Sequence, residues 1–212
     1  MPFEVYDYRT DVRNVVITPE IRSRFLRMEP GDVANRHSHD LGHEVFLVLD
    51  GYCEFEIEGE RAVLGPGQMC FARADQLHQV RTVGDAPMTM YLSVTPHVEP
   101  THTQWDEQGH KLPPRYGLAT ANERAAQPAS TASVADLAAR HVAAAKAVAE
   151  LAAANADAQA ASAADLERAV AAGDQAAARA AVDAMWSHLY ETIRGVHALE
   201  AVWNELAVYG EA

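Results

Sequence analysis

Three histidines and one glutamate in the first half of the chain have the side chains and the spacing of a metal site. His37 and His39 are two residues apart, so on a strand both imidazoles project from the same face. Glu44 follows after a short connection and opens the next strand, from which its carboxylate can return to the same point. His78 begins a later strand and offers a fourth ligand. Neutral imidazoles and a carboxylate are donors that a divalent first-row transition metal accepts.

Neighbouring residues of similar chemistry are interpreted differently. His43 directly precedes Glu44, so on a strand it points to the opposite face, and we leave it out of the site. Cys53 and Cys70 can form a redox pair or act as soft ligands. Cys53 and Phe55 are two residues apart and share one face of a predicted strand, so we interpret the cysteines as core residues.

The elements that must position the four residues are strands. Up to about residue 100 the chain is rich in Gly and Pro, and its apolar residues alternate with polar ones, as in half-buried strands. Asp50-Gly51 and Glu58-Gly59 lie between apolar runs and predict tight turns. Many short strands joined by turns indicate an antiparallel sandwich or barrel. The predicted strands are residues 15–17, 23–28, 44–49, 52–58 and 88–94.

The spacing of these residues resembles the motifs of a known family. Gly31, five residues, His37-x-His39, four residues, Glu44, six residues and Gly51 is similar to the first motif of the cupin superfamily, and residues 67–78 resemble the second. In that second region the family commonly has proline, glycine and asparagine at the positions of Arg73, Asp75 and Thr82. The resemblance covers roughly residues 23–94. It implies an antiparallel double-stranded β-helix, the jelly-roll or cupin barrel, in a mainly β chain.

The same resemblance implies one divalent metal ion bound by His37, His39, Glu44 and His78, with open positions for water or substrate. Iron, manganese, nickel, zinc and copper all suit these donors. We expect a metal-dependent oxidoreductase of the dioxygenase type, acting on a small, partly apolar substrate, with Glu44 able to act as a base. The alternatives are a metal-dependent isomerase or lyase and a non-catalytic binding module. An apolar cavity or simple barrel filling is expected from Phe46, Val48, Phe55 and Ile57.

The second half of the chain is predicted to be helical. We divide the chain into a barrel over residues 1–100, an irregular connector over 101–130 and an α-helical C-terminal extension over 131–212. Ser133 and Ser162 resemble helix caps, and Gly195 can break a helix, so three or four helices are expected. An apolar stripe from Val182 to Leu206 needs a partner. Together with the frequent pairing of small cupin barrels, it predicts a homodimer with the helical tail against a barrel or in the subunit interface.

Composition excludes several classes of partner. The chain has 212 residues, with 17 Lys and Arg against 30 Asp and Glu, for a formal charge of −13. This charge argues against nucleic acid and anionic membranes as partners and leaves a small-molecule substrate or ligand. Two cysteines are too few for a secreted disulfide scaffold, and the first ten residues show no signal peptide. We therefore expect a cytoplasmic protein.

Overall fold

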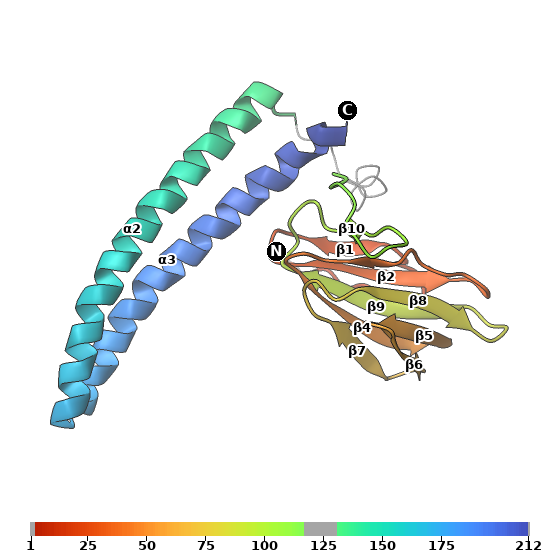
Figure 1. Ribbon diagram of the computed structural model, residues 1–212, viewed down its shortest axis with the longest axis horizontal. Coiled ribbons are helices and arrows are strands. Elements are labelled where there is room, and N and C mark those ends of the chain that lie inside the picture. Colours follow the sequence, from red (N-terminus) through yellow and green to blue (C-terminus); the bar gives the residue numbers. More distant parts are fainter. Residues whose placement is uncertain (1–2, 117–130, 212) are drawn as a thin grey trace. The chain divides into compact units, whose positions relative to one another are not determined.

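A computed structural model describes residues 3–116 and 131–211 of the chain (Figure 1). This part contains a β unit and a separate helical unit over residues 131–206. The β unit has ten strands in two five-stranded antiparallel sheets, ordered β1-β2-β9-β4-β7 and β10-β3-β8-β5-β6. The first sheet contains β1 (Asn14–Ile17), β2 (Arg22–Met28), β4 (His43–Asp50), β7 (Met69–Ala72) and β9 (Met88–Thr95). The second contains β3 (His37–Ser38), β5 (Tyr52–Ile57), β6 (Glu60–Leu64), β8 (His78–Val83) and β10 (Thr103–Gln104).

The core of the β unit lies between the inner faces of the two sheets. Along β4 every second residue is buried, beginning with Glu44 and continuing with Phe46 and Val48. Cys53 and Phe55 of β5 face them, and the Phe46 and Phe55 ring centroids are 4.6 Å apart. The alternation in the sequence therefore marks the inner face, and the aromatic residues fill the barrel. The expected mainly β jelly roll with a helical extension is confirmed.

Two turns that contain glycine connect successive strands. Glu58 and Gly59 join β5 to β6 with φ angles of 50° and 84°, the left-handed pair that a two-residue hairpin turn of type I′ requires. Gly51 joins β4 to β5 with a φ of 71°. A Cβ atom there would lie 2.4 Å from the carbonyl oxygen of Pro87, so this position also needs glycine for space.

The turn before β8 keeps its shape without the glycine that the family commonly has there. Asp75 adopts a φ of 65°, a conformation that aspartate tolerates better than most side chains. Its carboxylate accepts a hydrogen bond from Lys111 Nζ at 2.7 Å. Local charge pairing thus supports a turn that brings the chain back into β8 at His78.

The helical unit consists of α2 (Val134–Ala172) and α3 (Gln175–Ala207), joined by a tight turn. Ser133 caps α2 as expected by accepting a hydrogen bond from the backbone N–H of Asp136. The prediction of three or four helices is wrong for the described residues, which contain these two and a 3₁₀ turn at Val208–Glu211. Ser162 lies inside α2, because the surrounding alanines propagate the helix without interruption.

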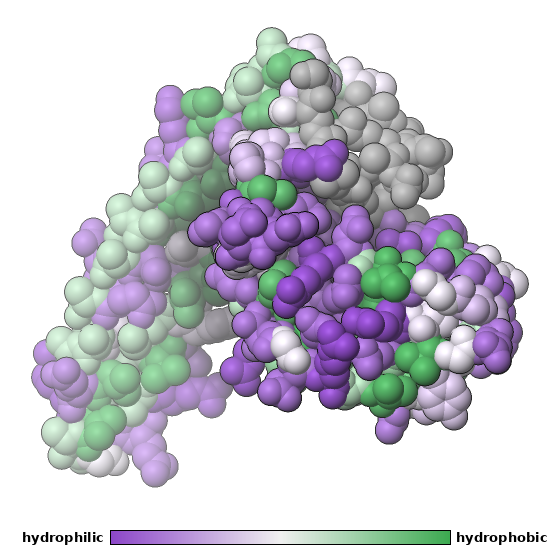
Figure 2. Space-filling view, turned by 45° about the vertical axis from the view of Figure 1, so that its right-hand side comes forward, coloured by the Kyte–Doolittle hydropathy of each residue, from purple (hydrophilic) through white to green (hydrophobic). Residues whose placement is uncertain are grey.

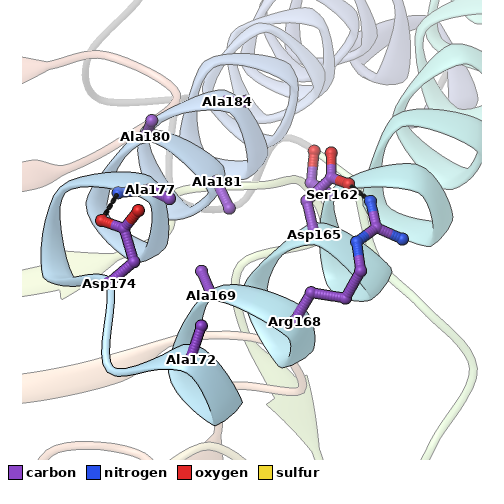
Figure 3. Close-up of a pocket in the computed structure, with 10 residues that line it drawn as sticks. All are labelled: Ser162, Asp165, Arg168, Ala169, Ala172, Asp174, Ala177, Ala180, Ala181 and Ala184. Carbon is purple, nitrogen blue, oxygen red and sulfur yellow. Dashed lines mark hydrogen bonds and ion pairs between the residues drawn. The ribbon is translucent and has the colours of Figure 1, made fainter.

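Glycines have two different roles in this hairpin. Gly173 ends α2 in the left-handed conformation with a φ of 68°. Gly195 does not break α3, contrary to expectation. A Cβ atom there would lie 2.7 Å from Leu151 Cδ1, so this glycine lets the two helices approach closely. Near the turn, a 510 Å³ groove is lined mainly by alanines of both helices and bordered by the Arg168–Asp165 ion pair (Figure 3).

Neither helix of the described part combines the length and apolar character needed to cross a bilayer. Residues 117–130 of the expected connector lie outside the described residues.

Candidate metal centre

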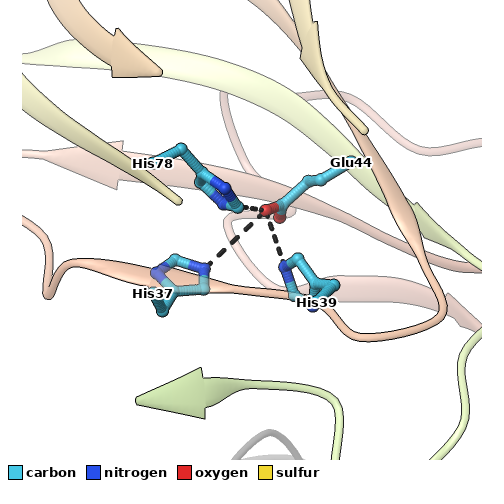
Figure 4. A group of neighbouring side chains, drawn as sticks. All are labelled: His37, His39, Glu44 and His78. Atoms are coloured by element: carbon cyan, nitrogen blue, oxygen red, sulfur yellow. Dashed lines mark hydrogen bonds and ion pairs between the residues drawn. The ribbon is translucent and has the colours of Figure 1, made fainter. Parts of the chain in front are cut away.

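The four predicted ligands meet between the two sheets. His37 and His78 occupy directly opposed positions of β3 and β8 in one sheet, and His39 follows β3. Glu44 is the first inward-facing residue of β4 in the other sheet. Period-two alternation thus aims the carboxylate at the histidines from across the barrel. All four residues that the sequence selected are brought together (Figure 4).

The ligand atoms converge on one small, buried space. The Nε2 atoms of His39 and His78 lie 2.9 Å and 3.0 Å from Glu44 Oε2, and His37 Nε2 lies 3.8 Å from it. All four donor atoms are within 4.8 Å of one another. An ion about 2.1 Å from each ligand needs donors roughly 3–4 Å apart, so the cluster is close to the required size.

Backbone carbonyls fix the tautomer of all three imidazoles. The Nδ1 atoms of His37 and His78 each donate to a carbonyl oxygen at 2.8 Å, and that of His39 donates to a third. Because a carbonyl can only accept, each Nδ1 carries the hydrogen, and each neutral ring points the lone pair of Nε2 toward Glu44. The accepting residues are Asn35, Gln76 and Thr101, respectively.

Both charge and burial favour the forms that bind a cation. Burial lowers the pKa of His37, which keeps this imidazole neutral. Burial alone would raise the pKa of Glu44, but without a bound ion a positive charge on His39 and hydrogen bonds from Nε2 of His39 and His78 hold that pKa well below its usual value. A bound ion would take the place of these Nε2 protons and leave the rings neutral. A carboxylate and three lone pairs would repel one another unless positive charge lay among them. His37 Nε2, buried and without a hydrogen bond in the described part of the chain, is also placed to take a metal. The four residues therefore fit a divalent transition metal ion.

The residues set aside in the sequence lie outside this cluster. His43 is exposed on the outer face of β4, where its Nδ1 accepts a hydrogen bond from the backbone N–H of Ala74 at 2.9 Å. Cys53 is buried in the core and Cys70 packs against it. Both are free thiols, and burial raises their pKa values to about 11 and about 12. The interpretation of the cysteines as core residues is confirmed.

A fourth histidine was missed by sequence reasoning. The ring centroid of His102 lies 4.7 Å from that of His37 and 4.9 Å from that of His39. Burial is the main reason why the pKa of His102 lies well below its ordinary value, so the ring is neutral. His102 stands in the segment expected to be an irregular connector, and no spacing relates it to the other ligands. The sequence offers only its residue type as a signal.

The segment that carries His102 wraps the strand of the ligands. Thr103 and Gln104 of β10 pair with Ser38 and His37 of β3. Trp105 Nε1 donates a hydrogen bond at 3.0 Å to the Oγ atom of Ser38, the residue between the candidate ligands His37 and His39. The start of the connector is thus part of the sheet, and it braces β3 from the side opposite β8.

Comparison with known proteins agrees with this geometry. Residues 24–95 match the family model described as "Cupin domain". This barrel belongs to the cupin superfamily. A stretch of 69 residues of this chain is also 30% identical to the polyketide synthase CurC of Streptomyces cyaneus. That match covers 32% of this chain and only 45% of the relative's length.

Solved structures with similar folds include TT1209 from Thermus thermophilus, which is 23% identical with a TM-score of 0.43. That match covers 44% of this chain and 98% of the other. The DMSP lyase DddQ from Ruegeria pomeroyi is 24% identical with a TM-score of 0.39, covering 44% of this chain and 47% of the lyase.

Proposed function

We propose that the cupin barrel is a metal-dependent enzyme of the dioxygenase type that acts on a small, partly apolar substrate. The observation that supports this most is the convergence of three Nε2 lone pairs and the Glu44 carboxylate on one buried point. A divalent ion held there would polarise an enolate or carboxylate oxygen, and iron, manganese, nickel or copper would also bring oxygen to the substrate.

The protein residues around the site define how a substrate would be received. The side chain of His37 is 16% exposed, whereas those of His39, His78 and Glu44 are almost fully buried. The Phe46 ring lies 5.8 Å from His78 and packs on Phe55, which closes the barrel interior to water. A substrate would therefore enter beside His37, where His102 also lies.

The expected substrate class is a compound with two oxygen donors that can chelate one metal ion and an acidic C–H or O–H, such as a β-diketone, a catechol or a flavonol. Such compounds bind an open metal site through both oxygens. The relative from Streptomyces cyaneus is named a polyketide synthase, and β-diketone units are the chemistry of polyketide chains. This supports β-diketones as the first compounds to test.

The test combines metal analysis with oxygen uptake. The purified protein should contain close to one transition-metal ion per chain and should consume oxygen with at least one member of a panel of β-diketones, catechols and flavonols. His43→Ala is the matched control, because it changes a histidine next to Glu44 that lies on the outer face of β4. Metal-loaded protein that consumes no oxygen across the panel contradicts a dioxygenase.

A second candidate, a metal-dependent isomerase or lyase, is favoured by His102. A neutral imidazole beside the ligands can accept a proton at its unprotonated ring nitrogen when a bound substrate loses one. The distinguishing experiment is exchange of the substrate C–H in D₂O without oxygen, followed by NMR. Exchange that is lost in His102→Gln while metal content is retained supports this candidate over the dioxygenase. Release of an unaltered ligand on denaturation, with no turnover, would instead indicate a non-catalytic binding module.

A further inference from the structure

The helical unit leaves a large apolar face outside its own core. In the described part of residues 131–206, the buried apolar side chains are Leu137, Ala169, Ala181 and Val202, and only Leu137 is fully buried. Four such residues are a very small core for two helices of 39 and 33 residues. Most apolar side chains of this unit therefore lie on its outside.

Specific contacts fix the relative levels of the two antiparallel helices. Thr192 Oγ1 bonds to the carbonyl oxygen of Leu151, and Gln159 Nε2 donates to the carbonyl oxygen of Met185 at 2.8 Å. Arg140 pairs with Glu205 at 3.1 Å nearer the open end. On this register, Ile193 of α3 is level with about residue 151 of α2.

One stripe of α3 carries large, exposed apolar side chains. Its members recur every three or four residues, the spacing of a helix-packing seam, and are 36–56% exposed. Ile193 and Val196 of this stripe directly follow Thr192 and Gly195, which both contact α2. The stripe is therefore turned about 100° from the side that faces α2. This α3 ridge consists of Val182, Trp186, Leu189, Ile193 and Val196.

A row of small side chains on α2 lies on the same face of the hairpin. Each member of the row comes one position after a residue of α2 that faces α3; Leu151 and Asn155 are two such residues. Because the helices are antiparallel, an equal turn on each brings the ridge and the row to the same side. Figure 2 shows hydrophobic residues in green along this unit. The α2 row consists of Ala138, Val142, Ala145, Ala149, Ala152, Ala156 and Ala163, and none of them is charged.

We propose that a second copy of this chain covers the face, with the α3 ridge of each copy packed on the α2 row of the other. Rotation by 180° about an axis parallel to the helices brings four of the five ridge residues level with a row residue of the partner copy, and it places Trp186 level with Gln159, between Ala156 and Ala163. Ile193 then meets Ala152, Leu189 meets Ala156, and the result is an antiparallel four-helix bundle.

The match between large and small residues is the argument for a second copy over an unrelated partner. A two-fold interface needs both complementary surfaces on one molecule, and the ridge and the row meet that need at the same levels. A specific interface buries roughly 1,200–2,000 Å² in total, and the ridges and rows of the two copies contribute ten and fourteen side chains to such a surface. Stacking ridge on ridge would instead hold the alanine rows apart and leave a gap between them.

The test uses two lysine substitutions on exposed alanines of the same helix. Ala152→Lys places a charge in the α2 row, whereas Ala154→Lys places it on the side of α2 turned away from the row. Both positions are exposed in a single hairpin, so both variants should keep their helical circular dichroism. In sedimentation equilibrium of the metal-loaded, full-length protein, the wild type and Ala154→Lys should be dimers at micromolar concentration. Ala152→Lys should raise the dimer Kd by at least about 100-fold, because two unpaired charges would be buried.

Cross-linking tests the pairing itself. Leu189→Cys together with Ala156→Cys should give a disulfide-linked dimer, and Leu189→Cys alone should not. The native cysteines interfere little, because burial raises their pKa values. A monomeric wild type overturns the proposal, as it would if the barrel of the same chain covered this face. Equal effects of the two lysine substitutions on the dimer Kd also overturn it. Cross-linking by Leu189→Cys alone overturns the proposed pairing of ridge and row. Metal content stays unchanged in every variant, so failure here is distinct from failure of the proposed function.

Discussion

Acidification of the metal-loaded protein gives a direct measure of how many histidines hold the ion. A coordinated imidazole has no lone pair left for a proton, so in the loaded, folded state all three ligand histidines stay unprotonated. In the unfolded chain the same residues take up protons near pH ~6.5. Their folded-state affinity for protons is therefore depressed, as burial alone already does to the pKa of His37.

The sign and size of the effect follow from this difference. Stability from the ligand histidines is fully present above about pH 6.5 and is lost as the pH falls below it, because the unfolded state then binds more protons. Between about pH 7 and 5.5 each ligand histidine lowers the free energy of unfolding by about 1.2 kcal/mol, so three lower it by about 4 kcal/mol. Below about pH 4.5 the stability of the folded protein falls further, because the pKa of Glu44 is lower in the folded state than in the unfolded chain.

The assay is urea unfolding of the metal-loaded and the chelator-treated protein across this pH range. The difference between the two free energies is the quantity to follow, because His97, whose pKa burial lowers to about 4, and the acidic surface affect both forms. We expect the difference to shrink by roughly 2–3 kcal/mol between about pH 7 and 5.5, because burial lowers the pKa of His37 in both forms and its share of about 1.2 kcal/mol cancels. A change of less than about 1 kcal/mol would refute coordination by three histidines.

Three further changes test other parts of the structure. His37→Ala and His39→Ala should each lose most of the bound metal by elemental analysis, whereas His43→Ala should keep it; unchanged content in both ligand variants contradicts the site. Gly51→Ala should lower the free energy of unfolding by at least about 3 kcal/mol, because it adds a clash with Pro87 to left-handed strain. Gly59→Ala, with a φ of 84° but open space around it, should cost only about 1–2 kcal/mol, and equal losses would show that the clash is absent. Trp105→Phe removes the hydrogen bond to Ser38 and should weaken metal affinity about tenfold in a chelator competition, with the melting temperature of the chelated protein as control.

The pattern of the first half, together with its resemblance to the cupin motifs, allowed both the barrel and the cluster of four candidate ligands to be predicted from the sequence. Alternation along β4 separates Glu44 from His43 without any knowledge of the fold, because successive side chains of a strand point to opposite faces. The glycine turns at Gly51 and Gly59 are equally local, since each depends on a backbone conformation that few other residues adopt.

What could not be predicted depends on contacts between distant segments. His102 reaches the site because β10 pairs with β3 across more than sixty residues, and no local pattern encodes that pairing. The continuity of α2 through Ser162 depends on a balance between a capping signal and long alanine runs, which the runs dominate. Gly195 has the residue type of a helix breaker, but its role is set by Leu151 on the other helix.

The carbonyl oxygen that orients His39 belongs to Thr101, just before β10. The free energy of metal binding and that of docking β10 onto β3 are therefore coupled, and the coupling is reciprocal. An event that detaches β10 must weaken the metal affinity by the same factor by which the ion strengthens the docking of β10. A change that loosens β10, such as Trp105→Phe, is therefore expected to lower the occupancy of the site when metal is limiting.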